Sequence, residues 1–139
     1  MFNAVVIDGQ GGGFGRQLVL KLKERLPRVF VTAVGANSAA TGVMLKAGAD
    51  AGATGENAVL VACRRADVIT GPVGIVIADA LFGEITPAMA LAVAQSPAKR
   101  VLLPFNHCDN LIAGVSDFNP AYLVKCAVDE IAKLTPDVG

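Results

Sequence analysis

The chain alternates between short apolar runs and stretches with helical spacing. Residues 3–7 are almost entirely apolar, which is typical of a strand buried on both faces of a sheet. Residues 16–26 instead place leucine at positions 18, 22 and 26, on one face of a helix that Pro27 ends. The same contrast predicts further strands at 29–34, 67–70 and 100–105 and further helices at 37–47, 54–65, 86–96 and 119–134, whereas 74–81 suits either a strand or a short helix.

Three of these helices have recognisable first residues. Thr86 and Asn119 each stand before a proline, which combines a capping side chain with a residue suited to the first helical position. Asn37 or Ser38 is available to cap the helix that runs to residue 47. These starts divide the second half of the chain into alternating helices and strands.

Strands separated by helices pair in parallel, because the helix carries the chain back across the sheet. We therefore predict a single Rossmann-like α/β domain over residues 1–139, a three-layer sandwich with a mostly parallel sheet in the order 3-2-1-4-5. A fifth strand is predicted at 111–115, only a few residues after the fourth. So short a connection cannot cross the sheet, so this last strand is expected to be antiparallel.

The composition is apolar for a chain of this size. Of the 139 residues, 53% are hydrophobic and 17% charged, so either the core is rich in alanine and valine or part of the apolar surface is buried in a homo-oligomer. The net charge is zero and the basic residues form no stripe, which argues against nucleic acid as a partner. The longest apolar stretch, Val73–Phe82, is too short to span a membrane.

Neither targeting nor metal binding is indicated. The N-terminal residues lack the basic and apolar segments of a signal peptide. The chain has an odd number of cysteines, Cys63, Cys108 and Cys126. Their spacing matches no common metal-binding motif, so no metal site is expected. Reduced cysteines predict a cytoplasmic protein.

The most informative segment follows the first strand. Residues 8–15, Asp-Gly-Gln-Gly-Gly-Gly-Phe-Gly, include five glycines. Glycine here allows a sharp turn, close packing of helix on sheet, and close approach of a ligand to the backbone. The start of the next helix offers free N–H groups that favour an anion. The pattern therefore predicts a phosphate-bearing ligand held by Gly9, Gln10, Gly11, Gly12, Gly13, Phe14 and Gly15, with packing alone as the alternative explanation.

The spacing of Gly9, Gly13 and Gly15 resembles the cofactor turn of the short-chain dehydrogenases. This resemblance implies that the three glycines line a dinucleotide pyrophosphate. Asp8 stands where that family has threonine or serine, and Tyr122 is followed by Lys125, one residue too early for the catalytic Tyr-x-x-x-Lys pair. The second strand is also not followed by an acid for ribose hydroxyls. NAD(P) is therefore one option beside another nucleotide, coenzyme A or a sugar phosphate.

Small and polar residues follow the other predicted strands too. Ligands of open α/β sheets bind at the carboxyl ends of the strands, so these segments are expected to meet around the glycine turn. The additional binding candidates are Asn37, Ser38, Thr70, Gly71, Pro72 and Asn106.

Acidic and nucleophilic side chains in the same loops are weaker candidates. Glu56 suits helix capping and ligand contact equally, whereas capping is preferred for Glu84. Asp8, His107 and Cys108 are the candidates for catalysis, although His107 is better suited to donate a hydrogen bond to a ligand.

The whole chain resembles a family of short bacterial proteins classed as a domain of unknown function. The resemblance lies in residues 7–13, 54–58 and 83–87. It implies a Rossmann-like fold and no particular activity.

Three functions are consistent with these features. The first is a nucleotide- or dinucleotide-binding protein, in which a partner subunit completes the site. The second is a small enzyme acting on a phosphorylated metabolite, in which Mg²⁺ would separate Asp8 from a phosphate. The third is a structural subunit that binds no ligand.

Overall fold

The central sheet of the protein is parallel throughout. The computed structural model describes residues 1–105, 110–116 and 118–136. Among these residues, five strands pair in the order β3-β2-β1-β4-β5, each parallel to its neighbours. The strands are β1 (Asn3–Asp8), β2 (Phe30–Gly35), β3 (Ala51–Thr54), β4 (Val68–Pro72) and β5 (Lys99–Leu103).

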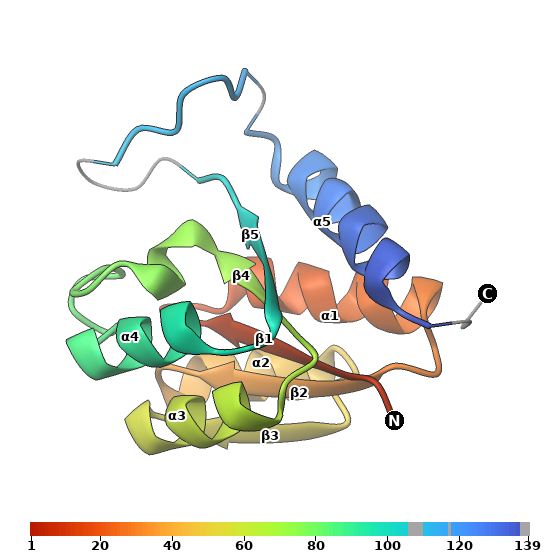
Figure 1. Cartoon of the computed structure of the whole chain (residues 1–139), viewed down its shortest axis with the longest axis horizontal. Helices are drawn as coiled ribbons and strands as arrows, with labels where there is room; N and C mark the ends of the chain where they lie inside the picture. The colour runs from red at the N-terminus through yellow and green to blue at the C-terminus, as the bar shows by residue number, and fades with distance from the viewer. Residues whose placement is uncertain (106–109, 117, 137–139) are drawn as a thin grey trace.

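Helices cover both faces of this sheet, which makes three layers (Figure 1). The helices α1, α2 and α5 pack on one face, and α3 and α4 pack on the other. A short 3₁₀ helix, η1, follows β4. The helix bounds are α1 (Gly13–Arg25), α2 (Ser38–Lys46), η1 (Val73–Val76), α3 (Glu56–Arg65), α4 (Pro87–Gln95) and α5 (Pro120–Leu134).

The central strand β1 divides the core in two. Ala4 and Val6 pack beneath α1 and α5, whereas Val5 and Ile7 pack beneath α3 and α4. All four side chains are fully buried, because successive residues of a strand point to opposite faces and both faces are covered. The apolar run that predicted this strand therefore reflects burial on two sides.

The predicted helix starts are confirmed by their capping contacts. The Asn37 side chain accepts a hydrogen bond from Ala40 N at 2.8 Å at the start of α2. Thr86 Oγ1 accepts from Met89 N at 3.2 Å at the start of α4. Asn119 Oδ1 accepts from Tyr122 N at 3.1 Å at the start of α5. Each contact satisfies one of the amides that a helix leaves unpaired at its first turn.

The predicted sheet order is confirmed, but different segments fill some of its places. The third strand is Ala51–Thr54, within a region where no strand was predicted. The segments predicted as third and fourth strands form β4 and β5 instead. Because β3 is short, lies at the sheet edge and consists of small residues, it lacks the apolar run that marks the other strands.

The predicted antiparallel fifth strand at 111–115 is wrong. Residues 113 and 114 form a turn, and Gly114 has a left-handed φ of +86°, which interrupts an extended chain. Leu111 is 82% exposed rather than buried in a sheet. The open choice at 74–81 is also settled, since η1 and a series of turns occupy this region.

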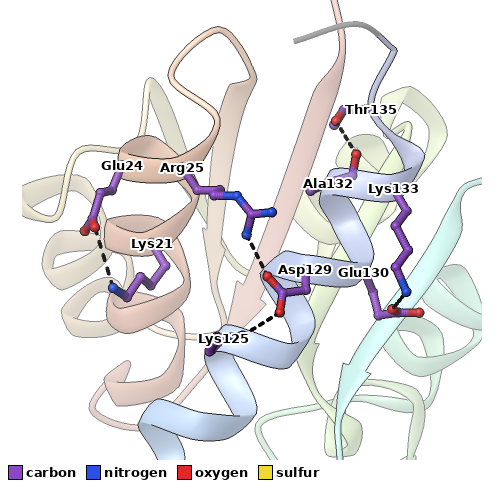
Figure 2. Close-up of polar contacts among 9 residues, drawn as sticks. All are labelled: Lys21, Glu24, Arg25, Lys125, Asp129, Glu130, Ala132, Lys133 and Thr135. Atoms are coloured by element: carbon purple, nitrogen blue, oxygen red, sulfur yellow. Dashed lines mark hydrogen bonds and ion pairs between the residues drawn. The ribbon is translucent and has the colours of Figure 1, made fainter. Parts of the chain in front are cut away.

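Asp129 of α5 forms one ion pair with α1 and a second within α5 (Figure 2). Arg25 Nη1 lies 2.6 Å from Asp129 Oδ1, and Lys125 Nζ lies 2.8 Å from Asp129 Oδ2. Hydrogen bonds from Lys125 and Arg25 lower the pKa of Asp129. Solvent screens such pairs, so the buried side chains beneath them dominate the attachment of α5.

We expect burial, not these ion pairs, to determine the stability of this layer. Leu22→Ala removes a fully buried side chain of α1 and should lower the free energy of unfolding by about 2–5 kcal/mol, measured by urea denaturation. Asp129→Asn, which weakens both ion pairs, should change the urea midpoint very little. Equal losses in the two variants would contradict this assignment.

Candidate functional site

A cleft lies where the sheet meets the start of α1. Its volume is about 200 Å³, and none of its described lining residues is a lysine or arginine. The rings of Phe14 and Phe105 meet edge to face on one side, with centroids 5.1 Å apart. The lining residues are Asp8, Gly9, Gln10, Gly11, Gly12, Gly13, Phe14, Pro72, Leu81 and Phe105. The cleft thus combines bare backbone with an apolar wall.

At three glycines of the turn, other parts of the chain occupy the space that a side chain would need. A Cβ at Gly9 would lie 2.6 Å from Glu84 Oε1, and a Cβ at Gly15 would collide with Met44 Sδ. Gly12 has φ +73°, and a Cβ there would lie 3.0 Å from the backbone of Ala40. These positions explain why the turn excludes side chains, without any reference to a ligand.

Gly11 and Gly13 differ from these three. Neither has a left-handed φ, and a Cβ at either position would have no atom within 4 Å. In the part of the chain that the structure describes, the amides of Gly11, Gly13 and Phe14 have no hydrogen-bond acceptor. Local structure therefore does not require glycine at positions 11 and 13, and their amides border the cleft.

Asp8 holds the turn together from below. Its Oδ1 accepts from Gly9 N at 2.8 Å and its Oδ2 accepts from Gly15 N at 2.7 Å. Burial raises the pKa of Asp8, while the hydrogen bonds from Gly15 and Gly9 oppose this shift and the charge of Glu84 adds to it. Both carboxylate oxygens are engaged by the backbone, which assigns Asp8 a structural role in the turn.

Glu84 reaches the same turn from a distant loop. Its Oε1 accepts from Gln10 N at 2.5 Å, and its Oε2 accepts from Asn37 Nδ2 at 2.6 Å. Asn37 Nδ2 also donates to Gln10 O at 2.9 Å. The preference for Glu84 as a helix cap was therefore wrong, since Thr86 caps α4. Glu56, the first residue of α3, accepts from Thr86 Oγ1 at 2.6 Å instead of lining the cleft.

The predicted binding residues are partly brought together. Residues 8–14 and Pro72 line the cleft. Gly15 and Gly71 are packed against other parts of the chain, and Ser38 is the first residue of α2. Thr70 is fully buried, and its Oγ1 has no hydrogen-bond partner among the described residues. Asn106, His107 and Cys108 lie outside the described residues.

Sequence reasoning missed two lining residues, Leu81 and Phe105. Phe105 ends the run that predicted the fourth strand, so its place at a strand end could have been noticed. Leu81 has no such signal, because it reaches the cleft through a series of turns.

The described part of the chain has neither a metal-binding cluster nor a membrane-spanning helix. No group of three or more His, Cys, Asp or Glu side chains in it is placed to hold a metal ion. None of its helices is long and apolar enough to cross a membrane.

The parallel sheet in the order 3-2-1-4-5, with a glycine-rich turn after β1, defines a Rossmann-like α/β protein. Residues 3–136 match the family model of the domain of unknown function DUF3842, and the chain belongs to this family. No curated protein matches the chain. A dodecameric FMN-dependent UbiX-like decarboxylase from Escherichia coli O157:H7 is similar over 93% of this chain and 94% of that one, with 16% identity and a TM-score of 0.47.

Asp8→Asn tests the role of the carboxylate in the turn. The amide group of asparagine offers one acceptor where the carboxylate offers two, so one backbone N–H loses its partner. We expect the free energy of unfolding at pH 7 to fall by about 1–3 kcal/mol, measured by urea denaturation. Asp67→Asn is the matched control, because the exposed Asp67 carboxylate also accepts from a backbone amide, Asn3 N, and its substitution should have a smaller effect.

The difference in stability between wild type and Asp8→Asn should depend on pH. Since burial raises the pKa of Asp8 above its ordinary value of 3.8, the folded chain retains this proton to higher pH than the unfolded chain. The stabilisation that is linked to protonation of Asp8 is then fully present below pH 3.8 and is lost as the pH rises through the pKa of the folded state. The free energy of unfolding of wild type relative to Asp8→Asn should therefore decrease as the pH rises. An increase with pH would contradict a raised pKa of Asp8.

Proposed function

We propose that this protein binds a phosphate-bearing small molecule, a nucleotide or a related phosphate ester, in the cleft beside β1. The phosphate would accept hydrogen bonds from the amides of Gly11, Gly13 and Phe14. The start of α1 adds the partial positive charge of a helix N-terminus. The apolar side of the cleft, which includes Phe14 and Phe105, would contact the remainder of the ligand.

The observation that carries this proposal is the absence of a structural need for glycine at positions 11 and 13. Both positions have ordinary φ values and open space where a Cβ would stand. Without a Cβ at these two positions, a ligand can approach the backbone closely beside the cleft that both residues line. The free amides on the same segment supply the donors that a phosphate needs.

The charged residues around the cleft leave the backbone amides as the donors available to a phosphate. No described lining residue is basic, and Asp8 and Glu84 both lie at the turn. Each carboxylate is partly neutralised by backbone N–H donors, namely Gly9 and Gly15 for Asp8 and Gln10 for Glu84. An enzyme acting on a phosphorylated metabolite with Mg²⁺ remains the second candidate, because a cation would offset these two acidic side chains.

A thermal-shift panel tests the proposal directly. The panel holds NAD(H), NADP(H), ATP, GTP, coenzyme A and sugar phosphates, each with and without Mg²⁺. A ligand present at about a hundred times its dissociation constant should stabilise the fold by roughly 2.7 kcal/mol. Gly13→Leu should abolish this stabilisation, because the new side chain enters the cleft from a position with no atom within 4 Å.

Gly42→Leu is the matched control for this substitution. Gly42 is also a helical glycine with open space at its Cβ, but it lies in α2 and does not line the cleft. Its variant should respond to ligands as wild type does. Absence of any stabilisation in the wild type would favour a structural subunit, and a response that survives Gly13→Leu would place the ligand elsewhere. Stabilisation that requires Mg²⁺ and is lost in Asp8→Asn would favour the enzyme.

We also propose that the protein is a homo-oligomer. The support is a set of large apolar side chains at the surface, with Phe82 89% exposed, Leu111 82% exposed and Leu91 55% exposed. Light scattering during size-exclusion chromatography should give a mass above that of the 14.2 kDa chain. Phe82→Ser or Leu91→Ser should lower this mass, and a monomeric wild type would refute the proposal.

The described thiols support the expected cytoplasmic location. Cys63 and Cys126 are free, and burial raises the pKa of Cys63 to about 11. Cys63 lies in the core, and a thiol with so high a pKa is inert. Cys126 lies in α5 and is half-buried.

A further inference from the structure

We infer that Glu84 determines which phosphate compounds the cleft accepts, by admitting phosphomonoesters and excluding dinucleotides. This inference rests on the proposed function, because it concerns the ligand of the same cleft. The contacts that carry it are those of Glu84 and Asn37 on the β2 side of the turn.

A dinucleotide bound to a Rossmann-like sheet must extend from the glycine turn toward the end of β2. Its ribose hydroxyls are held there by a polar side chain that follows this strand. Asn37 is the first polar side chain after β2, which ends at Gly35. Whether Asn37 can bind a ribose therefore depends on which of its hydrogen-bonding groups are free.

The hydrogen bonds of Asn37 are already made within the chain. Its Oδ1 accepts from Ala40 N at 2.8 Å, and its Nδ2 donates to Gln10 O at 2.9 Å and to Glu84 Oε2 at 2.6 Å. Both donor hydrogens of the asparagine are therefore used, and a ribose hydroxyl could be bound only by donating to the remaining lone pair of Oδ1. A dinucleotide that needed a donor from Asn37 would have to break these contacts and leave Glu84 Oε2 without its donor.

Glu84 also fills the space between the turn and β2. A Cβ added to Gly9 would lie 2.6 Å from Glu84 Oε1, 3.0 Å from Leu81 Cδ1 and 3.3 Å from Ala36 Cβ. The backbone of Gly9 is therefore covered on this side. The negative charge of Glu84 would also oppose any phosphate placed on this side of the turn, whereas a single phosphate could bind on the other side, toward β4.

The cleft remains open on the other side of the turn, toward β4. It is lined there by Phe14, Pro72, Leu81 and Phe105, next to the free amides. Its volume of about 200 Å³ is below the roughly 300–1,000 Å³ typical of pockets for drug-sized ligands. A space of this volume suits one phosphate and part of one attached group, so the second phosphate of a pyrophosphate would have to lie outside the cleft.

Calorimetric titration of the full chain tests this inference. The probes are AMP, GMP and ribose 5-phosphate as phosphomonoesters, and NAD⁺ and ADP-ribose as compounds with a pyrophosphate. Wild type should bind its best monoester at least about tenfold more tightly than either pyrophosphate compound, a difference of roughly 1.4 kcal/mol. Equal or tighter binding of NAD⁺ would overturn the inference and leave the proposed function intact. Failure of all five probes to bind would instead count against both.

Variants at position 84 separate the two contributions of this side chain. Glu84→Ala removes both the volume and the charge of this side chain. It should lower the ratio of monoester affinity to pyrophosphate affinity by about tenfold. Glu84→Gln keeps the volume without the charge, and should lower this ratio less. Glu56→Ala is the matched control, because Glu56 is a nearby carboxylate that contacts Thr86 rather than the turn, and should leave the preference unchanged.

Folding of each variant is checked by its melting temperature without ligand. An unchanged preference in folded Glu84→Ala would overturn the role of Glu84. If Glu84→Ala does not fold, the inference is tested by the wild-type preference for monoesters and by Glu84→Gln. An unchanged preference in Glu84→Gln would show that the charge of Glu84 does not contribute.

Discussion

The carboxylate of Asp8 bridges the two ends of the glycine turn, and the geometry of the site depends on this contact. Its two oxygens accept from Gly9 N, next to the end of β1, and from Gly15 N, inside the first turn of α1. One side chain thus fixes the start of the helix relative to the central strand. Because Asp8 is only 5% exposed, loss of either hydrogen bond would leave a buried amide or a buried charge without a partner.

A turn held in this way can leave part of its backbone bare. Gly9, Gly12 and Gly15 are covered by Glu84, Ala40 and Met44, whereas nothing described covers Gly11 and Gly13 at their Cβ positions. The covered glycines position the segment, and the uncovered ones present amides to the cleft. The packing explanation of the glycine-rich turn therefore applies to Gly9, Gly12 and Gly15, whereas the proposed ligand concerns Gly11 and Gly13.

The loop between η1 and α4 completes the site at some conformational cost. Asp79, Leu81 and Phe82 all have left-handed φ values, of +68°, +57° and +55°, which are strained for residues other than glycine. The loop carries Leu81 into the cleft and Glu84 onto Gln10 N. These contacts, together with the burial of Ile85, offset the strain and place an acidic side chain at the glycine turn.

The sequence by itself determined the elements whose signals are local. Apolar runs and capping residues predicted β1, α1 and the starts of α2, α4 and α5, and the glycine-rich turn was predicted after the correct strand. It did not reveal β3, whose small residues at a sheet edge have no periodic pattern, and it wrongly suggested a strand at 111–115, where Gly114 turns the chain. Only the tertiary structure decided which turn glycines are covered and which are bare, because Glu84 is 74 residues from Gln10 and no local preference reports such a contact.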